Sequence, residues 1–211
     1  TAFHALAILG TAQGKRDFEI YMKAASIAQT VFTQNPSHPG AAHYLIHSFD
    51  DPVHAPLGLS AARAYADIAP AAAHALHMPS HIFVALGMWS HTAASNEDSW
   101  QAADNRVRRK GLTVKDRSYH ALWWLQYAYL QQGRYLEAYE LLSVMAQDVK
   151  ELDISLTRRH LAAMWAQYVI ETRRWATKEL FNDLDLTSMR AVDLAALLFA
   201  QGIAAMKSGT A

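Results

Sequence analysis

The chain has 211 residues, of which 52% are hydrophobic and 18% are charged, so it is long enough to bury a core and has the composition of an ordinary soluble protein. Lysine and arginine together number 19, as do aspartate and glutamate, and this balance gives no electrostatic reason to expect nucleic acid or an anionic membrane as a partner. The absence of cysteine excludes disulfides, thiolate nucleophiles and cysteine-ligated metal centres.

The start of the chain and its most apolar stretch bear on where the protein works. The chain begins at Thr1 without a methionine and enters helical sequence at once, so we expect a fragment of a longer protein or a processed form. Ala195 to Met206 is apolar, but Gln201 interrupts it and it is shorter than the ~18 residues of a membrane span. We therefore expect no membrane partner, while a cytoplasmic and a periplasmic location both stay open.

Apolar periodicity predicts helices along nearly the whole chain and no strand. Glycines and prolines fall between the helical stretches, and a basic segment, Arg106–Asp116, is predicted to be a longer loop. A last helix is expected from about Met189 to Met206, after about five helix pairs. The turns between paired helices are predicted, in chain order, at Gly14, Gly87, Gly133 and Arg173.

One segment, Leu122–Ala138, carries a recognisable repeat. Its first helix ends near Gly133, and a second helix starts at once with Tyr135 and Ala138 facing the first. This segment resembles the tetratricopeptide repeat (TPR) family, in which large residues on one helix pack against small and aromatic residues on the next. The resemblance implies an all-α, right-handed α-α superhelix, a TPR-like solenoid that forms a single domain over residues 1–211. It also implies a concave groove that binds a peptide, a protein segment or a small molecule.

Histidines form the second pattern, because eight of the eleven lie between His38 and His91. His43 and His47 are four residues apart, so they share a helix face. His77 follows His43 by 34 residues and His81 follows His47 by 34, and this spacing is the length of a TPR unit. Equivalent positions of successive units lie on helices packed ~8–10 Å apart, so these four histidines are predicted to form a square.

Offsets from the predicted turns extend this surface. In the resembled family, residues thirteen, ten and six positions before the turn face the concave groove. The groove predicted from these offsets and from the 34-residue spacing is lined by His4, His43, His47, His74, His77, His81, His120, Trp123 and Tyr127. Trp123 and Tyr127 would stack on a ligand or pack between repeats, and both interpretations stay open.

Imidazole chemistry gives the histidine square a second interpretation. Neutral imidazole binds zinc, copper, nickel and iron, so His43, His47, His77 and His81 are candidate ligands for a divalent ion such as zinc or copper. Asp50 or Asp51 would serve as a further ligand, as a partner for a ring nitrogen, or as a base that activates metal-bound water. A set of histidines that only donate and accept hydrogen bonds explains the pattern as well.

Three functions therefore stay open. The sequence favours a binding scaffold with a histidine- and aromatic-lined groove. The alternatives are a metal-dependent hydrolase, with Asp50 and Asp51 as catalytic candidates, and a metal-binding protein without catalysis. The sequence does not decide whether the chain is an enzyme. Pro79 is the critical residue, because it should kink this helix or delay its start. A helix that begins only at Ser80 would separate the face of His81 from that of His74 and His77.

Overall fold

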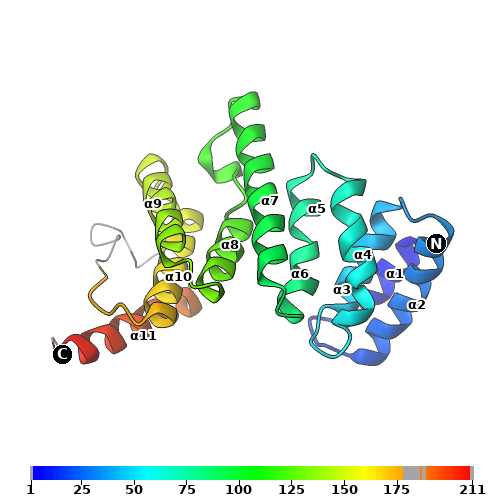
Figure 1. Ribbon diagram of the computed structural model, residues 1–211, viewed down its shortest axis with the longest axis horizontal. Coiled ribbons are helices and arrows are strands. Elements are labelled where there is room, and N and C mark those ends of the chain that lie inside the picture. Colours follow the sequence, from blue (N-terminus) through cyan, green and yellow to red (C-terminus); the bar gives the residue numbers. More distant parts are fainter. Residues whose placement is uncertain (1, 178–185, 187–188, 210–211) are drawn as a thin grey trace. The chain divides into compact units, whose positions relative to one another are not determined.

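The computed structural model describes residues 2–177, 186 and 189–209, and these residues form helices and no strand. The contacts divide the chain into two compact units, Thr1–Ala103 and Asp104–Ala211. Figure 1 labels the helices of both units. Each unit is described by itself below, and the single domain over residues 1–211 stays a prediction.

Two layers of helices build the first unit. Contacts between α1 and α3 and between α3 and α6 place the first helices of successive pairs side by side, while α2 and α4 pack behind them. Asp17 caps the N-terminus of α2, where its side chain accepts hydrogen bonds from the backbone nitrogens of Glu19 and Ile20 at 3.0 and 3.3 Å. The helices are α1 (Ala2–Gly10), α2 (Phe18–Gln34), α3 (Pro39–Phe49), α4 (Ala55–Ile68), α5 (Ala73–His77), α6 (Pro79–Ala85) and the first part of α7 (Trp89–Lys110).

Small residues let these helices approach one another closely. Ala24, Ala28 and Ala62 are buried in the first unit's core, which Leu45 and other large apolar side chains fill. Gly58 of α4 marks the closest approach, since a Cβ there would lie 2.7 Å from Ile82 Cδ1 of α6. The absence of a side chain at position 58 thus allows α6 to pack closely against α4, beside α3.

The predicted turns are confirmed by backbone angles. Gly14, Gly87 and Gly133 have φ values of +78°, +67° and +72°, a left-handed conformation that glycine adopts at low cost. Arg173, predicted to stand where a turn glycine would be expected, has a φ of +55° and is left-handed too. The sequence therefore located these turns correctly, including the one without glycine.

The second unit contains the segment that carries the clearest repeat. The α8–α9 pair packs with Ala138 and Leu122 fully buried, as the repeat pattern predicts. The second helix of the fifth predicted pair would begin just after the turn at Arg173, near Trp175. Residues 175 and 176 form a turn, and most of the residues from 178 to 188 lie outside the described part of the chain. The elements are η1 (Val114–Asp116), α8 (Tyr119–Gln131), α9 (Tyr135–Glu151), α10 (Ser155–Thr172) and α11 (Ala191–Ser208).

Two predictions about the second unit are wrong. The segment Arg106–Asp116 is not all loop, because α7 continues to Lys110. An ion pair of 2.7 Å between Asp104 and Arg108 supports that last turn, and its basic residues suit a helix C-terminus. The apolar stretch near the end of the chain is also longer than expected: α11 has 18 residues and is apolar enough, by length and composition, to cross a membrane.

Candidate metal centre

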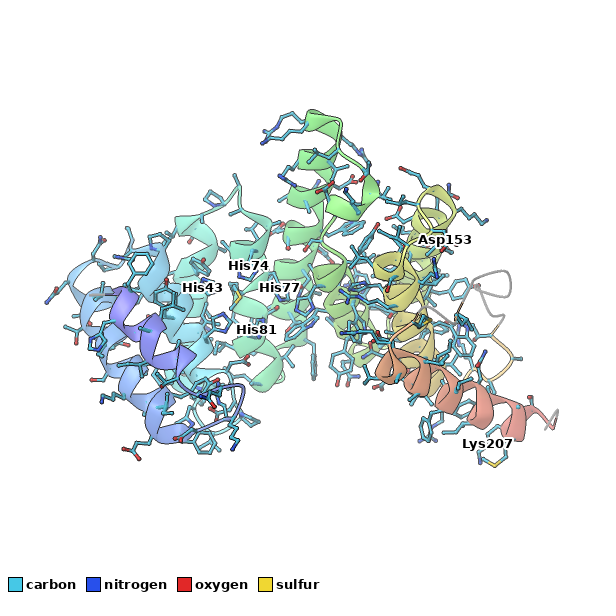
Figure 2. The ribbon with its side chains drawn as sticks, turned by 180° about the vertical axis from the view of Figure 1, so that it is seen from behind. His43, His74, His77, His81, Asp153 and Lys207 are labelled. Carbon is cyan, nitrogen blue, oxygen red and sulfur yellow. The ribbon has the colours of Figure 1, made fainter. Side chains whose placement is uncertain are left out.

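Five histidine side chains of the first unit form a closed ring, which we call the histidine ring: His43, His47, His74, His77 and His81. They come from α3, α5 and α6, and Figure 2 shows four of them close together. The distances between the centroids of neighbouring imidazoles are 4.7 Å for His43–His47, 6.1 Å for His47–His81, 5.1 Å for His81–His77, 6.5 Å for His77–His74 and 5.0 Å for His74–His43.

The closest nitrogens of the histidine ring meet around His43. Its Nε2 lies 3.0 Å from His47 Nε2 and 3.3 Å from His74 Nε2. A neutral imidazole nitrogen carries either one hydrogen or one lone pair, and each points along a single direction. One Nε2 atom therefore cannot make good hydrogen bonds to both neighbours at once, whereas a cation between the rings would be attractive to all of them.

Several of these side chains are held in the neutral form. Burial, and then the neighbouring His47, His74 and His81, lower the pKa of His43 from 6.5 to about 4. Burial, followed by the effect of His81, also lowers the pKa values of His47 and His74. The lone pairs that a metal ion needs are therefore present at neutral pH.

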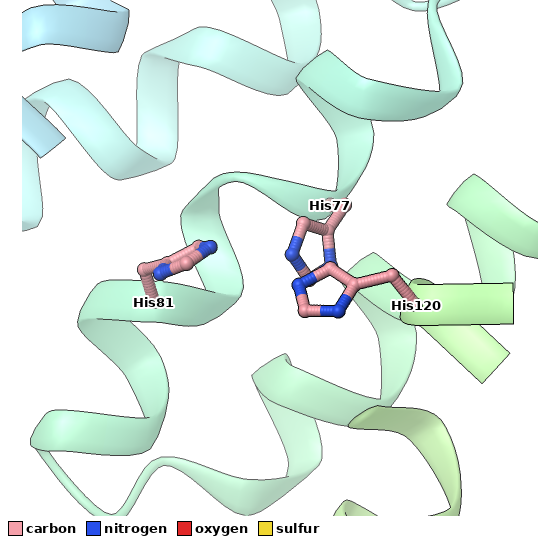
Figure 3. Close-up of side chains that lie close together, drawn as sticks. All are labelled: His77, His81 and His120. Carbon is pink, nitrogen blue, oxygen red and sulfur yellow. The ribbon is translucent and has the colours of Figure 1, made fainter. Parts of the chain in front are cut away.

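The other two histidines are anchored through their Nδ1 atoms. His81 Nδ1 lies 2.8 Å from Asp50 Oδ2, at the C-terminal end of α3. His77 Nδ1 lies 2.7 Å from Oδ1 of Asn96, a fully buried residue of α7. Figure 3 shows the His81 ring extending from α6 toward the His77 ring of α5; His120, also labelled there, belongs to the second unit.

The arrangement includes the four histidines of the predicted square and adds a fifth. His47 and His81, separated by one repeat length, do face each other across α3 and α6. Across from His43, however, stands His74. Pro79 is the physical reason, because proline cannot continue a helix from the preceding turn: α5 ends at His77, and α6 begins at Pro79. The break does not scatter the side chains, since His77 and His81 remain in ring contact.

The two aspartates have different environments. Asp50 contacts His81, whereas Asp51 accepts a hydrogen bond of 2.7 Å from Arg16 and lies 2.9 Å from His54 Nδ1. Burial raises the pKa of Asp51, but the hydrogen bonds from Arg16 and His54 outweigh it and lower that pKa to about 2. Arg16 also donates to the carbonyl oxygens of His47 and Ser48, so Asp51 belongs to a structural clamp at the end of α3.

The remaining groove candidates lie outside the histidine ring. His4 is exposed on α1. In the second unit, His120 is exposed with its ring 5.5 Å from that of Trp124, and Tyr127 is partly exposed. Trp123 is partly exposed, and its Nε1 donates to Gln167 Oε1 of α10 at 2.5 Å.

Sequence reasoning missed Asn96. A signal for it was present, because Thr92, Asn96 and Ser99 repeat at helical spacing on α7 and all three are fully buried. Buried polar side chains need hydrogen-bond partners, and Ser99 finds one in Ala73 O of α5 at 2.7 Å. A polar stripe on an otherwise buried helix face therefore pointed to the neighbouring histidine helix.

Comparison with known proteins identifies the fold. No known family model matches the chain, and no curated protein matches it. A crystal structure of nearly identical TPR-like repeats, from a single-residue variant attributed to a kinesin light chain of Podosopora anserina, is similar with a TM-score of 0.62. The match covers 98% of this chain and 94% of that chain at 15% sequence identity.

The chain thus has an all-helical, TPR-like repeat fold, as the segment Leu122–Ala138 predicts. At this level of identity the likeness defines the fold alone.

Proposed function

We propose that the first unit binds a divalent transition-metal ion at the histidine ring. The supporting observation is the spacing of the nitrogens around His43. Nitrogen ligands of a tetrahedral zinc ion, at about 2.0–2.1 Å from the metal, lie about 3.3–3.4 Å from one another. The Nε2 atom of His43 lies 3.0 Å from that of His47 and 3.3 Å from that of His74, so each pair is close to one edge of such a site.

The ion would contact only part of the histidine ring. Neighbouring centroids are 4.7 to 6.5 Å apart, which puts the middle of the ring farther from each imidazole than a metal–nitrogen bond allows. A ligating imidazole has its centroid about 3 Å from the metal. Three or four histidines therefore hold the ion, and His43 and His47, four residues apart on α3, form the core of the set.

The ligand chemistry favours particular ions. A site made of neutral imidazoles suits zinc, copper and nickel, whereas magnesium, calcium and manganese prefer carboxylate, carbonyl and water oxygens. Of the three roles open to Asp50, the contact with His81 Nδ1 supports that of a partner for a ring nitrogen. Asp51 is engaged by Arg16 and His54 and takes no part in the proposed site.

The test is metal content together with zinc and copper titration. The parent protein is expected to carry or take up metal, and a His43→Ala/His47→Ala double variant is expected to lose it while keeping its helical circular dichroism. A His4→Ala/His91→Ala variant is the matched control, because it removes two exposed imidazoles outside the histidine ring. No uptake by the parent after incubation with either metal would refute the proposal.

A second candidate, a scaffold for a peptide or protein segment, is favoured by the likeness to TPR-like repeats. Partly exposed Trp123 and Tyr127 on α8 would supply stacking surfaces in the second unit. Screening a peptide array with and without a chelator separates the two functions, because scaffold binding survives the chelator. Loss of all peptide binding on chelation, or no binding in either condition, would count against the scaffold.

A further inference from the structure

We propose that Asp50 and Asn96 are positioning residues of the histidine ring, which hold His81 and His77 with the proton on Nδ1, so that both present Nε2 to a bound ion. The role in metal binding rests on the proposed function, whereas the position of the proton is a property of the metal-free protein. Neither residue would touch the metal. Each acts through the histidine that it contacts.

The orientation of the Asn96 amide settles which atom faces His77. Asn96 Nδ2 donates to the carbonyl oxygen of Thr92 at 2.8 Å, so the amide oxygen is the atom that points at His77 Nδ1, 2.7 Å away. An oxygen can only accept here, and the proton must therefore reside on His77 Nδ1. Because Asn96 is fully buried, no water competes for this contact.

Asp50 fixes His81 in the same way. Its carboxylate Oδ2 lies 2.8 Å from His81 Nδ1, and an ionised carboxylate is an acceptor only. Asp50 follows directly on the last residue of α3, three residues after His47. One helix end thus supplies both a proposed ligand and the group that orients the facing histidine.

The consequence is a uniform set of ligand atoms. His43, His47 and His74 approach one another through Nε2, and the contacts at Nδ1 leave Nε2 as the lone-pair nitrogen of His77 and His81. Histidine ligands of metals are commonly held by such a contact at the second nitrogen, which fixes the ring and raises its basicity. Two partners of different chemistry, the Asp50 carboxylate and the Asn96 amide, thus place the proton on Nδ1 of two neighbouring imidazoles.

Substitutions of Asp50 and Asn96 test whether these residues orient the histidines or only pack against them. Asp50→Ala and Asn96→Ala remove the acceptors and are expected to weaken zinc binding by about 10- to 100-fold. Asp50→Asn keeps an oxygen that accepts from Nδ1, so it should restore most of the affinity lost in Asp50→Ala. Asp98→Ala, an exposed carboxylate on the same helix as Asn96, is the control and should bind zinc as the parent does.

Long-range proton–nitrogen NMR spectra of the metal-free proteins give the decisive readout, because packing alone would not set the position of a proton. The parent is expected to show His77 and His81 protonated on Nδ1, and His81 should shift toward protonation on Nε2 in Asp50→Ala but not in Asp50→Asn. Protonation on Nε2 in the parent, or an unchanged state in Asp50→Ala, would overturn the proposal even if Asn96→Ala fails to fold. A parent that keeps both protons on Nδ1 but binds no zinc or copper would refute the proposed function and the metal-binding role, while upholding the selection of Nε2.

Discussion

Replacing Gly58 by alanine tests how the helices that carry the histidines are held together. The new methyl group would lie 2.7 Å from Ile82 Cδ1 and 3.2 Å from Phe49 Cβ, and Ile82 is fully buried and cannot swing into solvent. Such overpacking costs about 1–3 kcal/mol. Alanine gains about 1 kcal/mol over glycine within a helix, so we expect a net loss of about 0–2 kcal/mol in the free energy of unfolding.

Gly202→Ala on α11 is the matched control, because its new methyl group meets no atom within 4 Å. It should stabilise its own unit by about 1 kcal/mol through helix propensity alone. Urea denaturation followed by circular dichroism measures both values, and the difference between the two variants isolates the packing cost at Gly58. Ile82→Val removes the Cδ1 atom, so in combination with Gly58→Ala it should recover part of that cost.

Zinc affinity extends the same experiment to the site. Ile82 directly follows His81, and Phe49 directly precedes Asp50, so a displacement at Gly58 reaches both partners of the His81–Asp50 contact. We expect weaker zinc binding in Gly58→Ala and parent-like binding in Gly202→Ala. If Gly58→Ala were as stabilised as Gly202→Ala and bound zinc equally well, the close approach of α4 and α6 would not be what brings the histidines together.

Three further predictions concern other contacts. Arg173→Gly should raise the free energy of unfolding by about 0.5–1 kcal/mol, because glycine adopts the left-handed turn without steric cost; thermal melts check this, and a lower melting temperature would contradict it. Arg16→Met should cost about 1.5–3 kcal/mol, because it removes a hydrogen bond to a carboxylate that is only 9% exposed. It should also raise the pKa of Asp51 from about 2, since the guanidinium that lowers it is gone. Urea denaturation and carboxyl NMR titration measure the two effects, and an unchanged pKa would contradict the clamp. Metal-free protein should lose stability as the pH falls from about 6.5 toward 4. Burial and the neighbouring histidines lower the pKa of His43, so the unfolded chain binds more protons than the folded one over that range. His43→Gln should make the dependence of stability on pH less steep between these values, and an equally steep dependence would refute the role of His43.

The sequence predicted the repeat better than it predicted how the histidine side chains are arranged. Turn glycines and the Leu122–Ala138 pattern report local packing, and local rules located them correctly. The square of four histidines followed from the 34-residue length of the repeat. The helix break at Pro79, however, places His74 beside His43, which it follows by 31 residues, and a fixed spacing of 34 residues cannot predict that neighbour. Asn96 was missed because it reaches His77 from another helix, and spacing within one helix cannot reveal such a contact.

Asp50 and Asp51 show the same limit at a finer scale. They are adjacent in sequence and chemically identical, yet one contacts His81 and the other is held by Arg16 and His54. The C-terminal end of α3, where the chain leaves the helix, sends the two carboxylates to different partners. Only the tertiary fold distinguishes the candidate for the metal centre from the residue that anchors a loop.

The histidine ring draws on segments that lie far apart in the chain: His43 contacts His74 from 31 residues away. An ion bound there would act as a removable cross-link between these segments. The unfolded chain has no preformed site for the ion, so binding would stabilise only the folded state. Ligand present at 100 times its dissociation constant stabilises a folded state by about 2.7 kcal/mol. In a chain without a single disulfide, the metal supply would then set how firmly the first unit stays folded.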